Sequence, residues 1–199
     1  MTLQDSQRRI PLVEQVRACR ICEADLPLGP RPVLQFNPAA RLLIASQAPG
    51  RKVHYSGVPF EDASGERLRD WLGIDRTVFY DDTKVAILPM GFCYPGKAKS
   101  GDLPPRKECA PAWRDKLMTE LQSLELILAI GNYAQAWHLP GVKGTLTERV
   151  RNWHQYGAVI PLPHPSPLNN LWLAKNPWFA GEVLPELRQR VKKALREKS

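Results

Sequence analysis

Four short apolar runs, each ended by a turn, constrain the fold of this chain more than any other feature of its sequence. They predict strands: one starts at Leu42 and stops at Ala48-Pro49-Gly50, and three lie over Lys84–Leu88, Glu125–Ile130 and Ala158–Leu162. Continuous apolar runs of this kind are typical of strands that are buried on both faces. Segments with helical features separate them, and strands that alternate with helices form parallel sheets. The sequence therefore predicts an α/β fold with a doubly wound parallel sheet.

The turn that ends the first strand is a candidate ligand site. Pro49 cannot continue a hydrogen-bonded ladder and Gly50 permits positive φ, so the chain leaves the sheet in a tight turn with exposed backbone amides. Ligands bind at the carboxyl ends of strands in open α/β sheets. The segment Val58–Gly65 then leads into a helix over Glu66–Leu72, which Gly73 ends. An ordinary loop between a strand and a helix would have the same pattern.

The other helices are predicted from their ends. Helical segments are expected over Gln7–Arg20, over Pro111–Leu121, between Gly131 and Leu139, and from the capping box of Thr145 and Glu148 to Trp153. Asn176 and Pro177 suit the first positions of closing helices. Between the second strand and the Pro111 helix runs a long loop, Phe92–Arg106, and a loop of this length inside a domain is usually functional.

Composition limits the class of protein. A chain of 199 residues suffices for one domain with a real core, so we expect a single domain over residues 1–199. No apolar run approaches the length of a membrane span, and Met1–Ser6 does not begin a signal peptide, so we expect a cytoplasmic protein with no membrane partner. A net charge of +8 favours a polyanionic partner, nucleic acid before membrane. Part of that charge, over Arg188–Lys198, is also what the solvated face of a last helix would carry.

The four cysteines form two pairs in the sequence. Cys19 and Cys22 have the C-x-x-C spacing, and Cys93 and Cys109 flank the long loop. A cytosolic chain rarely uses disulfides, so a metal or cluster is considered first. Four thiolates can hold one tetrahedral zinc ion or one cubane iron–sulfur cluster, and spacing alone does not choose between them. The remaining possibility is an exposed C-x-x-C pair together with two unrelated buried cysteines.

Five motifs occur in the order found in the uracil-DNA glycosylase superfamily. They are Ser46-Gln47-Ala48-Pro49-Gly50, Pro59-Phe60, the four-cysteine spacing, Leu128-Ala129-Ile130-Gly131 and His164-Pro165-Ser166-Pro167-Leu168. Each motif is weak alone, but the five in register are specific. The chain most resembles the family 4 enzymes, the iron–sulfur uracil-DNA glycosylases of bacteria and archaea. This resemblance implies a three-layer α/β/α sandwich with a four-stranded parallel sheet, and a 4Fe-4S cluster on Cys19, Cys22, Cys93 and Cys109.

The resemblance also implies a site for a base flipped out of DNA. Cleavage of an N-glycosidic bond places negative charge on the departing base, so the site needs hydrogen-bond donors, a stacking ring and a dry slot. By similarity, His164 donates to the base O2 and is the catalytic residue. Backbone amides around Gln47 and Ala48 hold the base edge, and Phe60 stacks on the base.

Contacts to DNA are implied at the second motif and in the long loop. By similarity, Pro165, Ser166 and Pro167 lie against the phosphodiester backbone, and Leu168 is the wedge that fills the vacated stack, which offsets part of the unstacking cost. In the long loop, Lys97, Lys99 and Arg106 are expected to contact phosphates.

Several positions differ from the family 4 pattern or from the classical uracil enzymes. Ser46 and Gln47 replace the glycine and glutamate of family 4, and glutamine is the residue type of the classical enzymes at that place. Ala48 stands where the classical enzymes carry a water-activating aspartate; family 4 also has alanine there, so general-base catalysis is not expected from this position. Gly50 stands where the classical enzymes have a tyrosine that blocks the thymine methyl. The largest departure is Pro89, which stands in place of the base-reading asparagine and has no side-chain amide to tell uracil from cytosine.

The leading hypothesis is therefore a monomeric, monofunctional DNA glycosylase that acts on a deaminated or oxidised base, uracil or a related one. The second hypothesis is a protein on the same fold that binds DNA or lesions without efficient catalysis. The third is a small electron-transfer protein, which would need neither the basic charge nor the His164–Leu168 loop. Glu61 and Asp62, next to Phe60, are the nearest carboxylates in sequence, and neither is expected to activate water.

Overall fold

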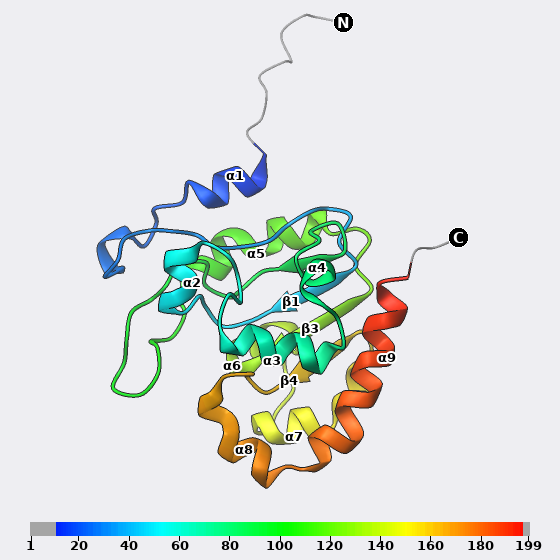
Figure 1. The fold of residues 1–199 in the computed structure, drawn as a ribbon. Helices are drawn as coiled ribbons and strands as arrows, with labels where there is room; N and C mark the ends of the chain where they lie inside the picture. The colour runs from blue at the N-terminus through cyan, green and yellow to red at the C-terminus, as the bar shows by residue number, and fades with distance from the viewer. Residues whose placement is uncertain (1–10, 197–199) are drawn as a thin grey trace, which may run out of the picture.

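The centre of the fold is a four-stranded sheet, seen in a computed structural model that describes residues 11–196 (Figure 1). Its strands are β1 (Leu42–Ala45), β2 (Val85–Ile87), β3 (Leu126–Ile130) and β4 (Val159–Leu162). All pairs are parallel and the order is β2-β1-β3-β4. The predicted parallel sheet is confirmed. The chain leaves β1 toward β2 and returns to the other side at β3, so the order reverses between the two central strands, where open α/β sheets bind ligands.

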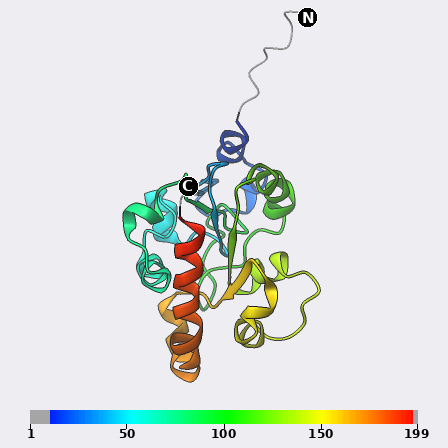
Figure 2. The ribbon, with the colours of Figure 1, turned by 90° about the vertical axis from the view of Figure 1, so that its right-hand side faces the viewer.

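Helices cover both faces of this sheet (Figure 2). They are α1 (Leu12–Arg17), α2 (Arg51–Ser56), α3 (Ala63–Leu72), α4 (Arg76–Phe79), α5 (Cys109–Glu120), α6 (Gly131–His138), α7 (Leu146–Arg151), α8 (Asn170–Lys175) and α9 (Leu184–Ala194). Short 3₁₀ turns lie at Glu23–Asp25, Trp153–Tyr156 and Pro167–Asn169, and a π-helical turn at Phe179–Val183 precedes α9.

Alternate residues of each strand point into two separate hydrophobic cores. Leu42 and Ile44 pack with residues of α3, α4 and α9, whereas Leu43 and Ala45 pack with residues of α1, α5 and α6. This two-residue period is the alternation of side chains across a strand. Because both faces are covered, every β1 residue is buried, which explains the continuous apolar run. The predicted three-layer α/β/α sandwich is confirmed.

Helix ends differ from the predictions where a side chain or a proline sets them. The helix predicted from Glu66 begins at Ala63, because the Asp62 carboxylate accepts a hydrogen bond from the Gly65 amide and caps it. The helix predicted from Pro111 begins at Cys109, which leaves the proline in the first turn, where its missing N–H is not needed. The capping box of Thr145 and Glu148 is present.

The predictions near the two ends of the chain need correction. Of the helix predicted over Gln7–Arg20, residues 7–10 lie outside the described residues, and α1 ends at Arg17, before the first cysteine. Near the other end, Asn176 and Pro177 do not open a regular α-helix. They open the π-helical turn, in which the Phe179 amide bonds to the Asn176 carbonyl. The helices α2, α4 and α8 were not predicted.

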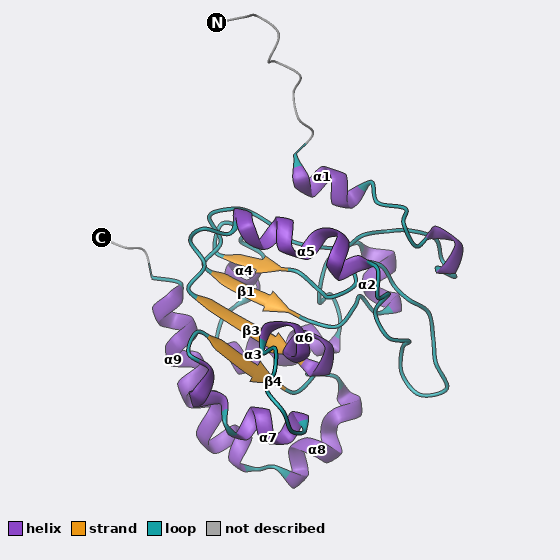
Figure 3. Cartoon of the chain, turned by 180° about the vertical axis from the view of Figure 1, so that it is seen from behind, coloured by secondary structure: helices purple, strands orange, loops and turns teal. Residues whose placement is uncertain are grey.

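The carboxyl ends of the strands all face the long loop (Figure 3). The loop forms no helix or strand, as predicted, but it folds back on itself through an isolated antiparallel bridge between Lys97 and Asp102. The Leu103 amide bonds to the Gly96 carbonyl at 2.8 Å. We call Gly96–Leu103 the hairpin. No helix within residues 11–196 combines the length and apolar character that crossing a lipid bilayer requires.

Candidate active site

A cavity of about 370 Å³ opens at the carboxyl ends of β1, β2 and β4, and we call it the main cavity. It is lined by the turn after β1, by segments around Phe60 and Pro89, by one side of the hairpin and by the His164 turn. Seven residues predicted from the sequence to touch a base or DNA line it: Gln47, Ala48, Gly50, Phe60, His164, Ser166 and Leu168. Pro165 and Pro167 alternate with His164, Ser166 and Leu168 in the same turn. Lys97 and Lys99 belong to the hairpin.

The turn after β1 is held by hydrogen bonds that continue the sheet. The Met90 amide donates to the Ser46 carbonyl at 2.8 Å, and the Gly91 amide donates to the Gln47 carbonyl at 3.0 Å. These bonds keep the turn beside Pro89, which also lines the main cavity. The turn ends in α2, which begins directly after Gly50.

The ring of His164 is fixed by its neighbours. The Ser166 amide donates to Nδ1 at 3.2 Å, so Nδ1 is the acceptor and a neutral ring carries its proton on Nε2. The Asn169 side-chain amide donates to the His164 carbonyl at 2.7 Å. Burial lowers the pKa of His164, and the negative charge of Asp62 offsets part of that shift. The site thus presents a neutral imidazole with one N–H to donate.

Phe60 has a backbone conformation that few side chains adopt. Its φ is +57°, and of the described residues other than glycine it alone has a positive φ. Its carbonyl lies against Gly65: a Cβ there would be 1.8 Å from the Phe60 oxygen. Its ring is 8% exposed and meets the Phe79 ring edge-on, with centroids 6.1 Å apart. Backbone strain of this kind clusters at functional sites, so the core contact does not make Phe60 a plain core residue.

Leu168 is not a core residue. Its side chain is 73% exposed, at the rim of the main cavity, and the nearby Leu103 of the hairpin is 41% exposed. The two segments approach closely, since a Cβ on Gly101 would lie 3.6 Å from the Leu168 Cδ1. An exposed leucine at a cavity rim has the position that a wedge between bases would need.

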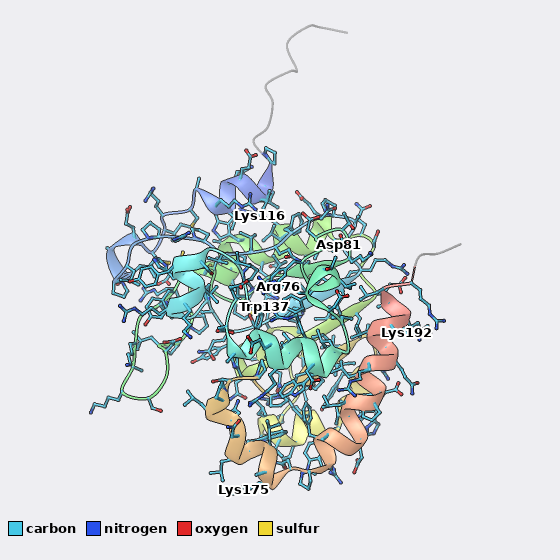
Figure 4. All side chains as sticks on the ribbon, in the orientation of Figure 1. Arg76, Asp81, Lys116, Trp137, Lys175 and Lys192 are labelled. Carbon is cyan, nitrogen blue, oxygen red and sulfur yellow. The ribbon has the colours of Figure 1, made fainter. Side chains whose placement is uncertain are left out.

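Two carboxylates line the main cavity, and sequence reasoning missed one of them. Asp62 was considered because it is close to Phe60 in sequence. Asp102 belongs to the hairpin, and it is not part of any motif that the sequence analysis identified. Glu61 is engaged elsewhere, because its carboxylate pairs with Arg76 at 2.6 Å (Arg76 is labelled in Figure 4).

A buried arginine supports the turn at Pro89. Arg114 of α5 is 1% exposed and donates to the carbonyls of Leu88 at 2.9 Å and Pro89 at 3.2 Å. Its other nitrogen contacts Nε2 of His138 at 2.8 Å. Burial and the arginine charge lower the pKa of His138 to about 3, so that ring is neutral and accepts the bond. Nothing in the sequence indicated that Arg114, one of several charged residues in α5, supports the Pro89 turn.

All four cysteines line a second, smaller cavity, which we call the cysteine cavity. Two sulfurs accept hydrogen bonds: Cys19 from the Trp113 indole at 3.2 Å, and Cys109 from the Phe92 amide at 3.3 Å. Burial raises the pKa of Cys93 to about 11 and that of Cys109 to about 12. Within residues 11–196 no three histidine, cysteine or carboxylate side chains are arranged closely enough to hold a metal ion. The donor set, four thiols around an apolar space with N–H groups directed at sulfur, nevertheless fits a thiolate-bound group.

Arg106 lies at the cysteine cavity and not with the lysines of the hairpin. Its guanidinium pairs with Asp25 at 2.8 Å and with Glu108 at 3.1 Å. A guanidinium held by two carboxylates is less available to a phosphate, so this placement favours a structural role over the predicted DNA contact.

A comparison with family models identifies the family of the chain. The model described as the Uracil DNA glycosylase superfamily matches residues 34–188. The matched segment includes the four strands and the residues Phe60, Asp102 and His164. Cys19 and Cys22 precede it, so the match does not bear on the cysteine cavity as a whole.

Proposed function

Because the chain belongs to the uracil-DNA glycosylase superfamily, we propose that it is a monofunctional DNA glycosylase of base excision repair. Its substrate is a deaminated or oxidised base that has flipped out of DNA. The observation that carries this proposal is the main cavity, where His164, Phe60 and the turn after β1 meet although they lie far apart in the sequence. The cavity has the size of a small-molecule site.

In this proposal, each residue of the main cavity has a distinct role in cleavage of the glycosidic bond. Phe60 stacks on the flipped base, and the backbone of the turn at Gln47 and Ala48 holds its edge. The Nε2–H of His164 donates a hydrogen bond to the base oxygen on which negative charge develops, which stabilises the transition state more than the bound substrate. Leu168 fills the gap that the flipped base leaves in the duplex, and Ser166 with the flanking Pro165 and Pro167 meets the backbone.

The lining of the main cavity argues against strict uracil specificity. Pro89 has no side-chain amide to read the base, and Gly50 has no side chain to exclude a 5-substituent. A site that lacks hydrogen-bonding groups for one base rejects its relatives poorly. The substrate class is therefore broader than uracil and extends to bases such as hypoxanthine, xanthine and 5-hydroxymethyluracil.

A panel of oligonucleotides tests the function. Single-stranded and duplex DNA carrying uracil, hypoxanthine, xanthine or 5-hydroxymethyluracil is incubated with the protein and scored for abasic sites, with undamaged DNA as the control. We expect base release from at least one lesion. Tight lesion binding without release would instead support a damage-binding protein, and neither binding nor release would leave electron transfer as the remaining hypothesis.

We further propose that Cys19, Cys22, Cys93 and Cys109 hold a 4Fe-4S cluster. The four-thiol lining and the N–H groups directed at two sulfurs support a thiolate-bound group. When bound, such a cluster would join the segment after α1 to the two ends of the long loop. The alternative occupant is zinc, because four thiolates can also hold one tetrahedral zinc ion.

Cysteine substitution tests the cofactor. Protein purified without oxygen should be brown, with iron and sulfide in equal amounts. Replacing any one of the four cysteines with serine should remove the colour and lower the folded yield, because ligand binding stabilises the fold that brings distant ligands together. If the protein is colourless and holds one zinc per chain, the four cysteines form a zinc site and not a cluster site. If it is colourless and holds no metal, both the cluster and the zinc proposals are wrong.

Salt-dependent binding tests the hairpin lysines. Replacing Lys97 and Lys99 together with alanine should weaken binding to all DNA sequences alike. The slope of log K against log salt should fall by about 0.9 for each phosphate that the variant no longer neutralises. Lys192→Ala is the matched control, since Lys192 lies on α9, on the opposite side of the view in Figure 4 from the long loop. Equal slopes for the double variant and the parent would show that the hairpin is merely solvated.

A further inference from the structure

We propose that Asp102 is a further catalytic residue: its carboxylate takes the proton of the attacking water and faces the positive charge that develops on the sugar. This inference rests on the proposed glycosylase function and deepens it. Asp102 lines the main cavity together with His164 and Phe60, and it remains accessible to solvent, as a group that works on water must be.

The hairpin fixes the position of Asp102. The residue pairs with Lys97 across the hairpin, and bonds from Leu103 to Gly96 and from Ala98 to Gly101, 2.8 and 3.1 Å long, close it on both sides. The Tyr94 hydroxyl lies close enough to the carboxylate to lower the pKa of Asp102. A side chain on a free loop would be poorly placed for catalysis, whereas this one is carried by a backbone that hydrogen bonds close on both sides.

The carboxylate lies directly against the turn after β1. Its Oδ2 is 3.4 Å from the point that a Cβ on Gly50 would occupy. The residues of that turn, Ser46 to Gly50, have no ionisable side chain of their own. Asp102 therefore brings a negative charge to the part of the main cavity that would otherwise have none.

Binding alone does not explain a carboxylate in this position. The chain has a net charge of +8 and its proposed partner is a polyanion, so a negative group at the cavity repels the phosphates around the flipped nucleotide. The same charge is favourable in the transition state, in which the sugar acquires oxocarbenium character. An interaction that opposes binding of the substrate but favours the transition state raises the rate.

The other carboxylate of the main cavity is less suited to this role. Asp62 accepts the Gly65 amide at 3.0 Å as the cap of α3, which holds it in a structural task. Its charge still acts on Asp102: burial and Asp62 raise the pKa of Asp102, while the Tyr94 hydrogen bond and Lys97 lower it, and the net shift is upward. A raised pKa makes the carboxylate a better proton acceptor.

The step balances as a hydrolysis. The water oxygen forms a bond to the sugar C1′ as the bond from C1′ to the base nitrogen breaks, and the bonding electron pair leaves with the base. One water proton passes to the Asp102 carboxylate, while the His164 N–H stabilises the charge on the base oxygen. The base anion then takes a proton, through solvent, and the carboxylate is regenerated. The products are an abasic sugar and a free base, and nothing is oxidised or reduced.

Single-turnover kinetics on the lesion that the parent protein processes tests the inference. Asp102→Asn should slow base release about 10²-fold or more, the effect expected for a lost general base. The same variant should bind lesion DNA as tightly as the parent or more tightly, because a repulsive charge is gone. Asp70→Asn, the same change on an exposed part of α3, is the matched control and should match the parent in both measurements.

Chemical rescue separates a chemical role from a structural one. Formate should restore part of the rate of Asp102→Ala, because a small carboxylate can enter the open cavity, and should not speed the parent. An Asp102→Asn variant that keeps more than a tenth of the parental rate would overturn the inference, as would a loss explained by weaker DNA binding or an absence of rescue by formate. If the parent releases no base from any lesion, the proposed function fails and this inference fails with it.

Discussion

Replacing His164 with alanine is expected to lower the single-turnover rate of base release about 10²–10³-fold, the usual cost of removing one preorganised donor to a developing negative charge. The affinity for lesion DNA should change little, since the base oxygen becomes charged only in the transition state. The Ser166 amide donates to Nδ1 at 3.2 Å and so orients the ring, an orientation that a mobile water in the variant would lack. Rapid quench with DNA binding measured in parallel separates the two quantities.

Two further variants calibrate that result. Gln47→Ala should cost less, because the turn acts mainly through its backbone. His154→Ala removes an exposed histidine that does not line the main cavity and should match the parent. A His164→Ala variant that keeps most of the parental rate would exclude His164 as the main donor, and a loss confined to binding would have the same consequence.

The pH dependence of the parent rate gives a second readout for His164. Burial lowers its pKa from the ordinary value of about 6.5. The ring is therefore neutral at pH 6.5 and becomes protonated only at a lower pH. The rate should stay level as the pH falls through 6.5 and should decline only when the pH approaches the lowered pKa of His164. Asp102, whose pKa is raised by burial, adds an acid limb of its own. A rate that rises as the pH falls through 6.5 would mean that the imidazolium is the donor.

The sheet could be predicted because its signals are local. Each strand is a continuous apolar run ended by a turn residue, and burial on both faces produces that run whatever the rest of the chain does. Helix α2 was missed for the opposite reason. Arg51–Ser56 is short and contains a valine, a histidine and a tyrosine, none of which favours a helix strongly, so its conformation depends on packing.

The candidate site could be predicted only where motifs carried it. Phe60 and His164 were found through their resemblance to family motifs, and the structure brings them into one cavity. Asp102 could not be found, because its contribution depends on how the hairpin folds back over Gly50, which is a tertiary contact. Arg106 was assigned to DNA from its charge and its place in the long loop, but its partner Asp25 lies in a segment far away in the sequence, and charge alone does not reveal such pairing.

Replacing Gly65 with alanine is expected to have the largest effect on stability. In an exposed helix the change from glycine to alanine would stabilise the protein by about 1 kcal/mol. Here the added Cβ would lie 1.8 Å from the Phe60 carbonyl oxygen, a backbone atom that cannot rotate away. The strained Phe60 backbone must then shift, and overpacking of this kind costs about 3 kcal/mol. For a chain of this length that corresponds to a Tm lower by about 6–12 °C.

Gly181→Ala is the matched control for this prediction. Gly181 is exposed, and a Cβ there meets nothing within 4 Å, so its Tm should equal that of the parent or exceed it slightly. Since Phe60 lines the main cavity, Gly65→Ala should also weaken lesion binding and slow base release at temperatures where the variant is folded. Thermal unfolding followed by circular dichroism gives the first quantity and single-turnover kinetics the second. A Gly65→Ala variant with the Tm and the rate of Gly181→Ala would mean that the positive φ of Phe60 and its contact with α3 are not needed to hold the stacking ring.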